Sequence, residues 1–177
     1  MRSFHLDQAH NIWRTHLQKD DLVIDATCGN GHDAAILAPL CHTLHCFDIQ
    51  AAAIEKTREK LQDYSNVIYH NASHESFPAF EKPPKLIVYN LGYLPGSDKS
   101  IKTLPQTTLT SIKQALDLLP IGGIISITTY PGHLEGLDEE NLLLPFFKSL
   151  TSFIVHRYEV INKATAPKLT IIKNFVR

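Results

Sequence analysis

Apolar and polar positions along this chain alternate between two periods, one typical of strands and one typical of helices. Leu22–Ala26 is a short, continuous apolar run, which is typical of a strand buried on both faces of a parallel sheet. Residues 6–17 instead carry apolar side chains at helical spacing. Elements of the two kinds follow one another, which predicts an α/β fold with helices on both faces of a mostly parallel sheet. Further strands are predicted at 44–48, 67–69, 86–89, 124–129, 153–161 and 168–175, and further helices near His32, at 51–61, at 107–119 and with a start at Asp138–Glu140.

The last two predicted strands, 153–161 and 168–175, follow each other with only a short polar segment between them. This arrangement predicts an antiparallel hairpin at the end of a seven-stranded sheet. Five alternating strands with a terminal hairpin are typical of the Rossmann-like, class I methyltransferase fold. A dinucleotide-binding sheet, in contrast, usually continues with further parallel strands.

Length and composition fit a single domain that spans residues 1–177. The chain is 44% hydrophobic and 20% charged, as ordinary globular proteins are. Its apolar runs fall short of the roughly 20 residues that a membrane helix needs, and its first residues have no apolar signal core. We therefore expect a cytoplasmic protein with no membrane partner, and we expect its three cysteines to be reduced thiols.

Charge is distributed unevenly along the chain, although the formal net charge is only -1. Residues 1–98 hold 8 basic and 12 acidic residues, whereas residues 141–177 hold 6 basic residues and only Glu159 as an acid. The overall balance argues against a strongly basic nucleic-acid-binding protein. The C-terminal excess could contact phosphates, but a solvated face on the last helix and strands is the plainer interpretation.

A turn with two glycines follows the first predicted strand. Gly29 and Gly31 lie at the carboxyl end of that strand, where glycine lets the backbone approach a bound cofactor closely. Asp48 follows Asp25 by 23 positions, close to the offset of about 20 at which such folds place an acid on ribose hydroxyls. Gln50 would border the adenosine, and Asp25 is placed to reach a methionine amine directly or through water.

The turn lacks the third glycine of a dinucleotide-binding turn, and His32-Asp33 follows Gly31 instead. The third glycine serves tight packing near a pyrophosphate. Its absence disfavours a dinucleotide and favours S-adenosylmethionine, which has no pyrophosphate. The turn and the acid at position 48 therefore predict a binding site for this methyl donor.

Asn90-Leu-Gly-Tyr93 follows the fourth predicted strand and has the layout of the Asn-Pro-Pro-Tyr loop of amino-group methyltransferases. An amine that attacks a sulfonium methyl group must be neutral and in line, so an Asn oxygen and a backbone carbonyl that accept its N–H bonds would orient its lone pair. Tyr93 could stack on the substrate ring. An Asn-Gly turn with a core tyrosine is the structural alternative, which the position after a strand disfavours.

His133 follows the fifth predicted strand, so we expect it to face the same crevice and to accept a proton or hold the substrate. Glu135 could orient it or bind substrate. A purely structural histidine is the alternative. The segment from Cys41 to Cys46 holds two thiols and two imidazoles, but strand alternation would point them to opposite faces, so no metal site is predicted.

Several long motifs, in order, resemble the MnmM-type, YtqB-like methyltransferase family, once described as rRNA methylases. The resemblance spans nearly the whole chain. It implies a class I fold, S-adenosylmethionine as the cofactor, and methyl transfer to the amine of 5-aminomethyl-2-thiouridine at the tRNA wobble position. The anticodon region of tRNA is then the partner, and a homodimer is compatible with this function. The motifs are VIDATCGNGHD from Val23 to Asp33, FDIQ from Phe47 to Gln50, NLGYLPGSDKS from Asn90 to Ser100, the Thr107-Thr108 pair, and YPGHLEG from Tyr130 to Gly136.

Together, the patterns and the resemblance predict two sets of site residues, with catalytic roles for Asn90, Tyr93 and His133. The cofactor set is Asp25, Ala26, Thr27, Gly29, Asn30, Gly31, Asp33, Asp48, Ile49, Gln50, Ser73, His74, Asn90, Leu91 and Gly92. The substrate set is Tyr93, Asp98, Lys99, Thr107, Thr108, Tyr130, His133 and Glu135.

The segment Asn162–Pro167 departs from the family, in which similar proteins tend to carry an Asn and a Pro-Pro pair. Ala166 replaces a proline, and Ala164 stands where the Asn would be. An altered loop on the substrate side leaves two other substrate classes open, namely rRNA and a small-molecule amine or hydroxyl compound. A cofactor-binding RNA module without transfer chemistry is the non-enzymatic alternative.

Overall fold

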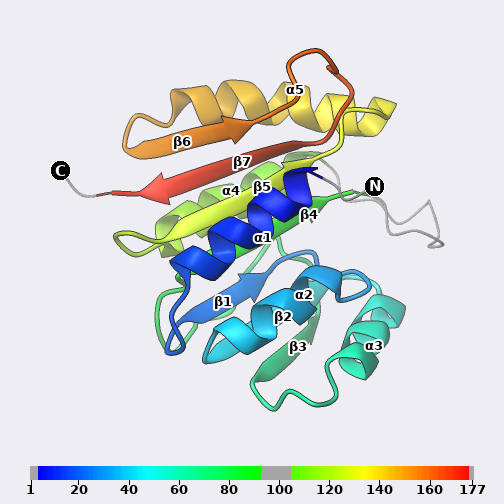
Figure 1. Ribbon diagram of the computed structural model, residues 1–177, viewed down its shortest axis with the longest axis vertical. Coiled ribbons are helices and arrows are strands. Elements are labelled where there is room, and N and C mark those ends of the chain that lie inside the picture. Colours follow the sequence, from blue (N-terminus) through cyan, green and yellow to red (C-terminus); the bar gives the residue numbers. More distant parts are fainter. Residues whose placement is uncertain (1–3, 93–104, 176–177) are drawn as a thin grey trace.

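The computed structural model describes residues 4–92 and 105–175, which form a seven-stranded sheet covered by helices (Figure 1). The strand order is β3-β2-β1-β4-β5-β7-β6. β1 to β5 pair in parallel, and β7 runs antiparallel to β5 and β6. The predicted class I arrangement with its C-terminal hairpin is therefore confirmed. The strands are β1 (Leu22–Asp25), β2 (Thr43–Asp48), β3 (Val67–Asn71), β4 (Leu86–Leu91), β5 (Ile124–Thr129), β6 (Phe153–Tyr158) and β7 (Lys168–Asn174).

The helices lie on both faces of the sheet, as the alternating pattern predicted. α1, α2 and α3 contribute to one buried apolar cluster, and α4 and α5 contribute to the other. None of the helices in the described part of the chain is long and apolar enough to cross a membrane. The helices are α1 (Phe4–His16), α2 (His32–Leu37), the short 3-10 helix η1 (Ala38–Leu40), α3 (Ala51–Lys60), α4 (Pro105–Leu118) and α5 (Leu134–Ser149).

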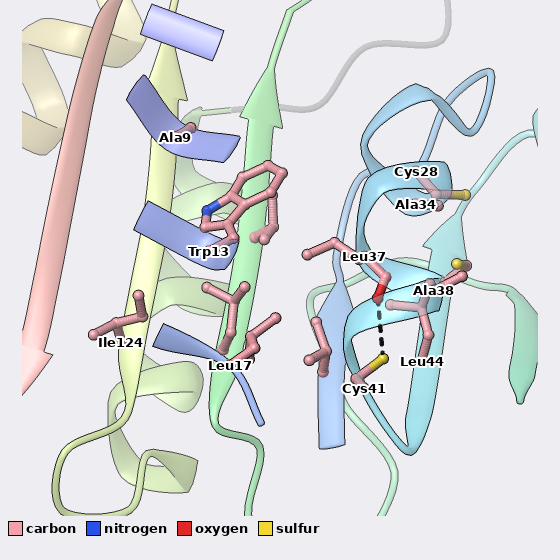
Figure 2. Packing of buried hydrophobic residues seen from close by; sticks show 14 of the residues in the cluster. Ala9, Trp13, Leu17, Cys28, Ala34, Leu37, Ala38, Cys41, Leu44 and Ile124 are labelled. Atoms are coloured by element: carbon pink, nitrogen blue, oxygen red, sulfur yellow. Dashed lines mark hydrogen bonds between the residues drawn. The ribbon is translucent and has the colours of Figure 1, made fainter. Parts of the chain in front are cut away.

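Helix α1 is held on the sheet by a large buried aromatic residue. Trp13 is only 1% exposed, and Ala9 and Leu17 extend its apolar stripe by one turn in each direction. Figure 2 shows these residues above β4 and β5, with Leu37 of α2 pointing toward Trp13. Burying a side chain of this size contributes on the order of 2–3 kcal/mol, so α1 is a firmly attached part of the fold.

Helix α5 begins earlier than the sequence predicted. The expected start at Asp138–Glu140 was wrong, because the helix begins at Leu134, directly after His133 in extended conformation. The acid in its first turn is Glu135. The acids further along the helix are therefore not held by the dipole at a helix start.

Two of the three acids that the sequence placed at the helix start are instead buried. Glu139 accepts a hydrogen bond from Thr108 of α4 at 2.9 Å, and Glu140 accepts one from Thr129 of β5 at 2.9 Å. Arg157 of β6 also bonds to Glu140. Neighbouring elements thus supply the partners that let these carboxyl groups lie inside the fold.

Part of the C-terminal positive charge is also used inside the fold. Lys168 lies 3.6 Å from Glu140 and 3.9 Å from Glu159, and the Arg157 guanidinium lies 3.3 Å from Glu159. The side chains of Arg157 and Lys168 are only 18% and 16% exposed. For these two residues, the interpretation as a solvated face was wrong, because both pair with acids.

Substitution of the two neighbouring acids Glu139 and Glu140 should change the stability of the protein in opposite directions. Burial raises the pKa of Glu139 to about 7 from its ordinary value of 4.5. An acid with a raised folded-state pKa loses stability as the pH rises from its unfolded pKa through its folded pKa. Glu139→Gln should therefore be more stable than the unchanged protein at pH 8, by about 1–3 kcal/mol, with the difference vanishing below about pH 4.5.

Glu140→Gln is the matched control, because it removes a carboxylate that two basic side chains contact. It should destabilise the protein at pH 8 by up to about 3 kcal/mol, since the charges of Arg157 and Lys168 are then only partly compensated. Urea unfolding at pH 5 and pH 8 measures both variants. A loss of stability in Glu139→Gln at pH 8 would contradict the assignment of Glu139 as a destabilised acid.

Candidate functional site

The turn after β1 is shaped by two glycines in the left-handed region. φ is 52° at Gly29 and 71° at Gly31, a conformation that residues with a side chain rarely adopt. A Cβ at Gly31 would lie 3.0 Å from Oγ1 and 3.1 Å from Cα of Thr57, because α3 packs against the turn. The Thr57 hydroxyl donates to the Gly29 carbonyl oxygen at 3.0 Å. Helix α3 therefore fixes the turn from one side.

Asp48, at the end of β2, fixes the same turn from the other side. One of its carboxylate oxygens accepts the Gly29 N–H at 3.0 Å, and the other accepts the Gln50 N–H at 2.9 Å. Burial raises the pKa of Asp48, whereas these two N–H groups lower it. The next residue, Ile49, is an apolar side chain that remains 44% exposed. An acid beside an exposed apolar surface suits the ribose hydroxyls and the flat base of an adenosine.

Asp25, at the end of β1, is fully buried, and only one of its two carboxylate oxygens has a hydrogen-bond partner among the described residues. Its Oδ1 accepts the Thr27 N–H at 3.2 Å, and its Oδ2 has no hydrogen-bond partner among the described residues. Burial raises the pKa of Asp25 well above its usual value, and the nearby carboxylates of Asp33 and Asp48 raise it further. A buried acid in this state requires either a proton or a cationic ligand.

Two further polar atoms at this edge are buried without a partner in the part of the chain that the structure describes. They are Oδ1 of Asn30, in the glycine turn, and Nδ1 of His74, after β3. Burial lowers the pKa of His74 to about 4, so its ring is neutral at pH 7. Buried polar atoms normally have partners. These two atoms are therefore available for a ligand that enters the site.

The residues at this edge fit S-adenosylmethionine. Three carboxylates that repel one another match the positive charges on the sulfonium and amino groups of this cofactor. The unpartnered atoms of Asp25, Asn30 and His74 belong to the predicted cofactor set and supply hydrogen-bonding capacity. The predicted cofactor contacts themselves stay predictions.

The Asn90 side chain is hydrogen-bonded to a buried carboxylate next to the glycine turn after β1. Its side-chain nitrogen donates to Oδ2 of Asp33 at 2.8 Å, and its backbone N–H donates to the Thr27 hydroxyl at 2.8 Å. The second oxygen of Asp33 accepts a bond from Nε2 of His10 at 3.0 Å. β4 pairs directly with β1, so these residues meet beside the glycine turn.

Tyr130, which follows β5, lies on the other side of the Asn90 turn. A Cβ at Gly92 would come within 3.2 Å of the Tyr130 ring, so the absence of a side chain there lets ring and backbone touch. The Tyr130 hydroxyl lies 3.4 Å from Nε2 of His5. Burial raises the pKa of Tyr130 to about 12. Tyr130 therefore keeps its proton at neutral pH and can donate a hydrogen bond.

Sequence reasoning missed His5 and His10, which α1 brings to this site. Both lie on a helix that was predicted only to pack on the sheet. One signal was available, because His5 stands four residues before Ala9 and eight before Trp13, on the buried stripe of α1. A histidine that continues an apolar stripe needs a polar partner inside the protein.

The other predicted site residues are placed in different ways. Tyr93, Asp98 and Lys99 lie outside the described residues. His133 and Glu135 are exposed at the start of α5, and Thr107 is half-buried near the start of α4. Thr108 is buried and donates to Glu139, so the structure places it between two helices. Of the remaining predicted cofactor residues, Ala26 and Leu91 are buried and Ser73 is half-buried.

The segment from Cys41 to Cys46 serves packing in this structure. Cys41 and Cys46 are buried free thiols, and the Cys41 thiol donates to the Leu37 carbonyl oxygen at 3.4 Å (Figure 2). Nδ1 of His45 lies 2.9 Å from Nε2 of His70 on the neighbouring strand. Within the described residues, no group of three or more potential ligands could hold a metal ion.

Comparisons with known proteins identify relatives along the whole chain. Residues 44–174 match the family model described as Putative rRNA methylase. A chloroplastic tRNA (mnm(5)s(2)U34)-methyltransferase from Arabidopsis thaliana is 35% identical over 93% of this chain and 67% of its own. A solved structure described as a putative rRNA-methylase from Clostridium thermocellum is 37% identical, with a TM-score of 0.91 over 98% of both chains. A putative methyltransferase from Streptococcus mutans in complex with SAH is 36% identical, with a TM-score of 0.87 over 97% of this chain and 98% of that one.

The buried carboxyl group of Asp25 should reduce the stability of the ligand-free protein. Its raised pKa means that stability falls as the pH rises from the unfolded pKa toward the folded one, and that the loss is complete above the folded pKa. Asp25→Asn keeps the acceptor for Thr27 and removes the charge. We expect it to stabilise the ligand-free protein at pH 8 by at least about 1 kcal/mol, seen as a rise of roughly 2–4 °C in Tm. An unchanged or lower Tm at pH 8 would argue against a strained acid at this position.

Proposed function

We propose a function from the premise that this chain belongs to the family described as Putative rRNA methylase. It is an S-adenosylmethionine-dependent methyltransferase, and its substrate is the amine of 5-aminomethyl-2-thiouridine at the wobble position of tRNA. The product is the 5-methylaminomethyl nucleoside. The observation that carries this proposal is the Asn90 amide at the end of β4, held by Asp33 beside the glycine turn of β1.

Two relatives support the cofactor and the substrate. The Streptococcus mutans structure is a complex with SAH, the product that a methyl transfer from S-adenosylmethionine leaves behind. The Arabidopsis thaliana relative is a tRNA methyltransferase whose name specifies U34. The Arabidopsis thaliana relative favours the anticodon region of tRNA over rRNA as the partner. We place the activity in the cytoplasm, as the sequence predicted.

In this proposal, residues at the edge of the sheet would contact the ribose, the base and the amino group of the cofactor. S-adenosylmethionine would supply a methyl group bound to a positively charged sulfur. An amine lone pair can attack that methyl group, and the sulfur then leaves as SAH. Asp48 would accept hydrogen bonds from the ribose hydroxyls, with Ile49 against the base. Asp25 would bind the amino group directly or through water, and its charge would then be compensated.

Asn90 would orient the attacking amine. Its amide oxygen accepts one N–H of the incoming amine, which directs the nitrogen lone pair away from the amide and toward the methyl group. The amine must be neutral for this, so one proton leaves it before the attack. Tyr130 cannot take that proton, because its pKa of about 12 keeps it protonated. It can instead donate a hydrogen bond or pack against the substrate.

Asp25→Asn should weaken binding of S-adenosylmethionine while it stabilises the ligand-free protein. Loss of a charge-assisted hydrogen bond to the amino group costs about 1.5–3 kcal/mol, which is roughly a tenfold to hundredfold increase in Kd. Isothermal titration calorimetry measures this change. Asp63→Asn, at an exposed position before β3, is the matched control and should leave Kd unchanged. Equal Kd values for Asp25→Asn and the unchanged protein would remove Asp25 from the cofactor site.

Methyl transfer to tRNA tests the proposed function itself. Purified protein is incubated with S-adenosylmethionine and with tRNA that carries the 5-aminomethyl group, and the nucleosides are analysed by mass spectrometry. We expect the modified uridine to gain one methylene unit of mass. Asn90→Ala should lower turnover by about a hundredfold or more, because the amine loses its orienting acceptor. Asn141→Ala, at an exposed position of α5, is the matched control and should retain full turnover.

Parallel reactions with rRNA and with the free nucleoside separate the alternative substrates. Preference for rRNA, or equal rates on the free nucleoside and on tRNA, would contradict the tRNA assignment. Binding of S-adenosylmethionine without methylation of any of the three would contradict the enzymatic function.

A further inference from the structure

The two ends of the Asn90 amide face different surroundings, and Asp33 determines which end faces where. A carboxylate can accept hydrogen bonds but cannot donate them. The atom that lies 2.8 Å from Oδ2 of Asp33 must therefore be the amide nitrogen. The amide oxygen is then the end that is turned away from Asp33. This is the orientation in which Asn90 can accept an N–H from a substrate amine.

Helix α1 holds the Asp33 carboxylate in place through a hydrogen bond, and Asp33 in turn orients Asn90. Nε2 of His10 lies 3.0 Å from Oδ1 of Asp33, and the two side chains are 18% and 10% exposed. His10 donates this bond in its charged form and in the neutral form with hydrogen on Nε2. Trp13, one turn further along α1, is 1% exposed and anchors the helix on the sheet. The position of Asp33, which lies on α2, therefore also depends on α1.

We propose that Asp33 and His10 form a positioning pair that holds the Asn90 amide with its oxygen toward the substrate amine. This inference rests on the proposed function, because it assigns the pair a role in the same methyl transfer. Neither residue touches the substrate. They act through Asn90, which makes them specific for amine orientation and separates them from the cofactor ligands at Asp25 and Asp48.

The pair also predicts what a neutral replacement of Asp33 would do. In Asp33→Asn, residue 33 has one acceptor end and one donor end. When His10 is charged, it donates, so the acceptor end of residue 33 faces His10 and the donor end faces Asn90. The Asn90 amide must then turn around, and its nitrogen faces the substrate amine. When His10 is neutral, it can accept through Nε2, and the native orientation of Asn90 is restored.

Titratable groups from several elements surround this pair. Asp25 of β1 and Tyr130 after β5 both interact electrostatically with Asp33, and the Tyr130 hydroxyl also forms a hydrogen bond with the Asn90 side chain. His5 of α1 interacts with Asp33, Asp7 and His10. In the unchanged protein, both oxygens of Asp33 accept whether or not His10 carries a charge. Asn90 therefore keeps its orientation whichever charge state His10 has. A pH dependence that requires His10 should appear only when Asp33 is replaced.

Kinetics of Asp33→Asn across pH 5.5–8.5 test the proposal. At the lower end we expect kcat to fall by about tenfold to a hundredfold, with KM for S-adenosylmethionine changed by less than about twofold. The loss should diminish toward the upper end of this pH range, because a neutral His10 can accept from residue 33. His10→Leu in the same background should abolish this pH dependence. His16→Gln, on the same helix but away from the site, is the control and should leave the profile of the unchanged protein intact.

Rescue by a conservative variant separates positioning from packing. Gln at position 10 can still donate to Asp33, so His10→Gln should retain a kcat within about threefold of the unchanged protein, whereas His10→Leu should lose about tenfold. Equal kcat values in the two His10 variants would overturn the proposal. A raised KM for S-adenosylmethionine in Asp33→Asn at constant kcat would also overturn it, because Asp33 would then be a cofactor ligand.

A substrate-free measurement distinguishes failure of this inference from failure of the proposed function. In 15N-labelled protein, the side-chain amide of Asn90 should be protected from hydrogen exchange and shifted downfield by its bond to Asp33, and Asp33→Asn at pH 5.5 should remove both effects. If these signals do not respond to Asp33, the positioning pair is wrong, whatever the substrate. If they respond while tRNA is not methylated, the positioning pair stands and the tRNA assignment fails.

Discussion

Three carboxylates share one edge of the sheet, and the surrounding structure depends on how their mutual repulsion is compensated. The parallel order places the ends of β1 and β2 next to each other, so Asp25 and Asp48 cannot be far apart. Asp48 is compensated by two backbone N–H groups, and Asp33 by His10 and Asn90. Among the described residues, Asp25 accepts only the Thr27 N–H. A bound cation would therefore complete the charge balance of the site, and the ligand-free protein is destabilised by the uncompensated Asp25.

This constraint explains why helix α1 belongs to the site as well as to the core. A buried carboxylate at position 33 needs a second donor besides Asn90, and no backbone N–H of the described residues is recorded as supplying it. α1 provides that donor through His10, and its buried Trp13 holds the histidine in place. The same helix brings His5 to Tyr130 at the other side of the Asn90 turn. Packing of α1 and orientation of the reactive groups are thus parts of one arrangement.

The sequence was sufficient for features that local periodicity and strand ends determine. Buried runs such as Leu22–Ala26 and the polar break before Lys168 predicted the sheet and its hairpin, and glycines at 29 and 31 marked the turn. Contacts between distant segments could not be read in this way. His5 meets Tyr130 across 125 positions, and Arg157 meets Glu140 only because β6 returns beside α5. The acids of α5 were misplaced for the same reason, since the partners that allow their burial lie on other elements.

The bonds at the site also connect the cofactor residues with the residue proposed to orient the amine. Asp25 accepts from the Thr27 backbone, the Thr27 hydroxyl accepts from the Asn90 backbone, and the Asn90 side chain donates to Asp33. Any ligand that changes the charge state of Asp25 acts on the first bond of this series. All three bonds are partly buried, and Thr27 takes part in two of them. The position of the Asn90 backbone therefore depends on the same residue that contacts Asp25.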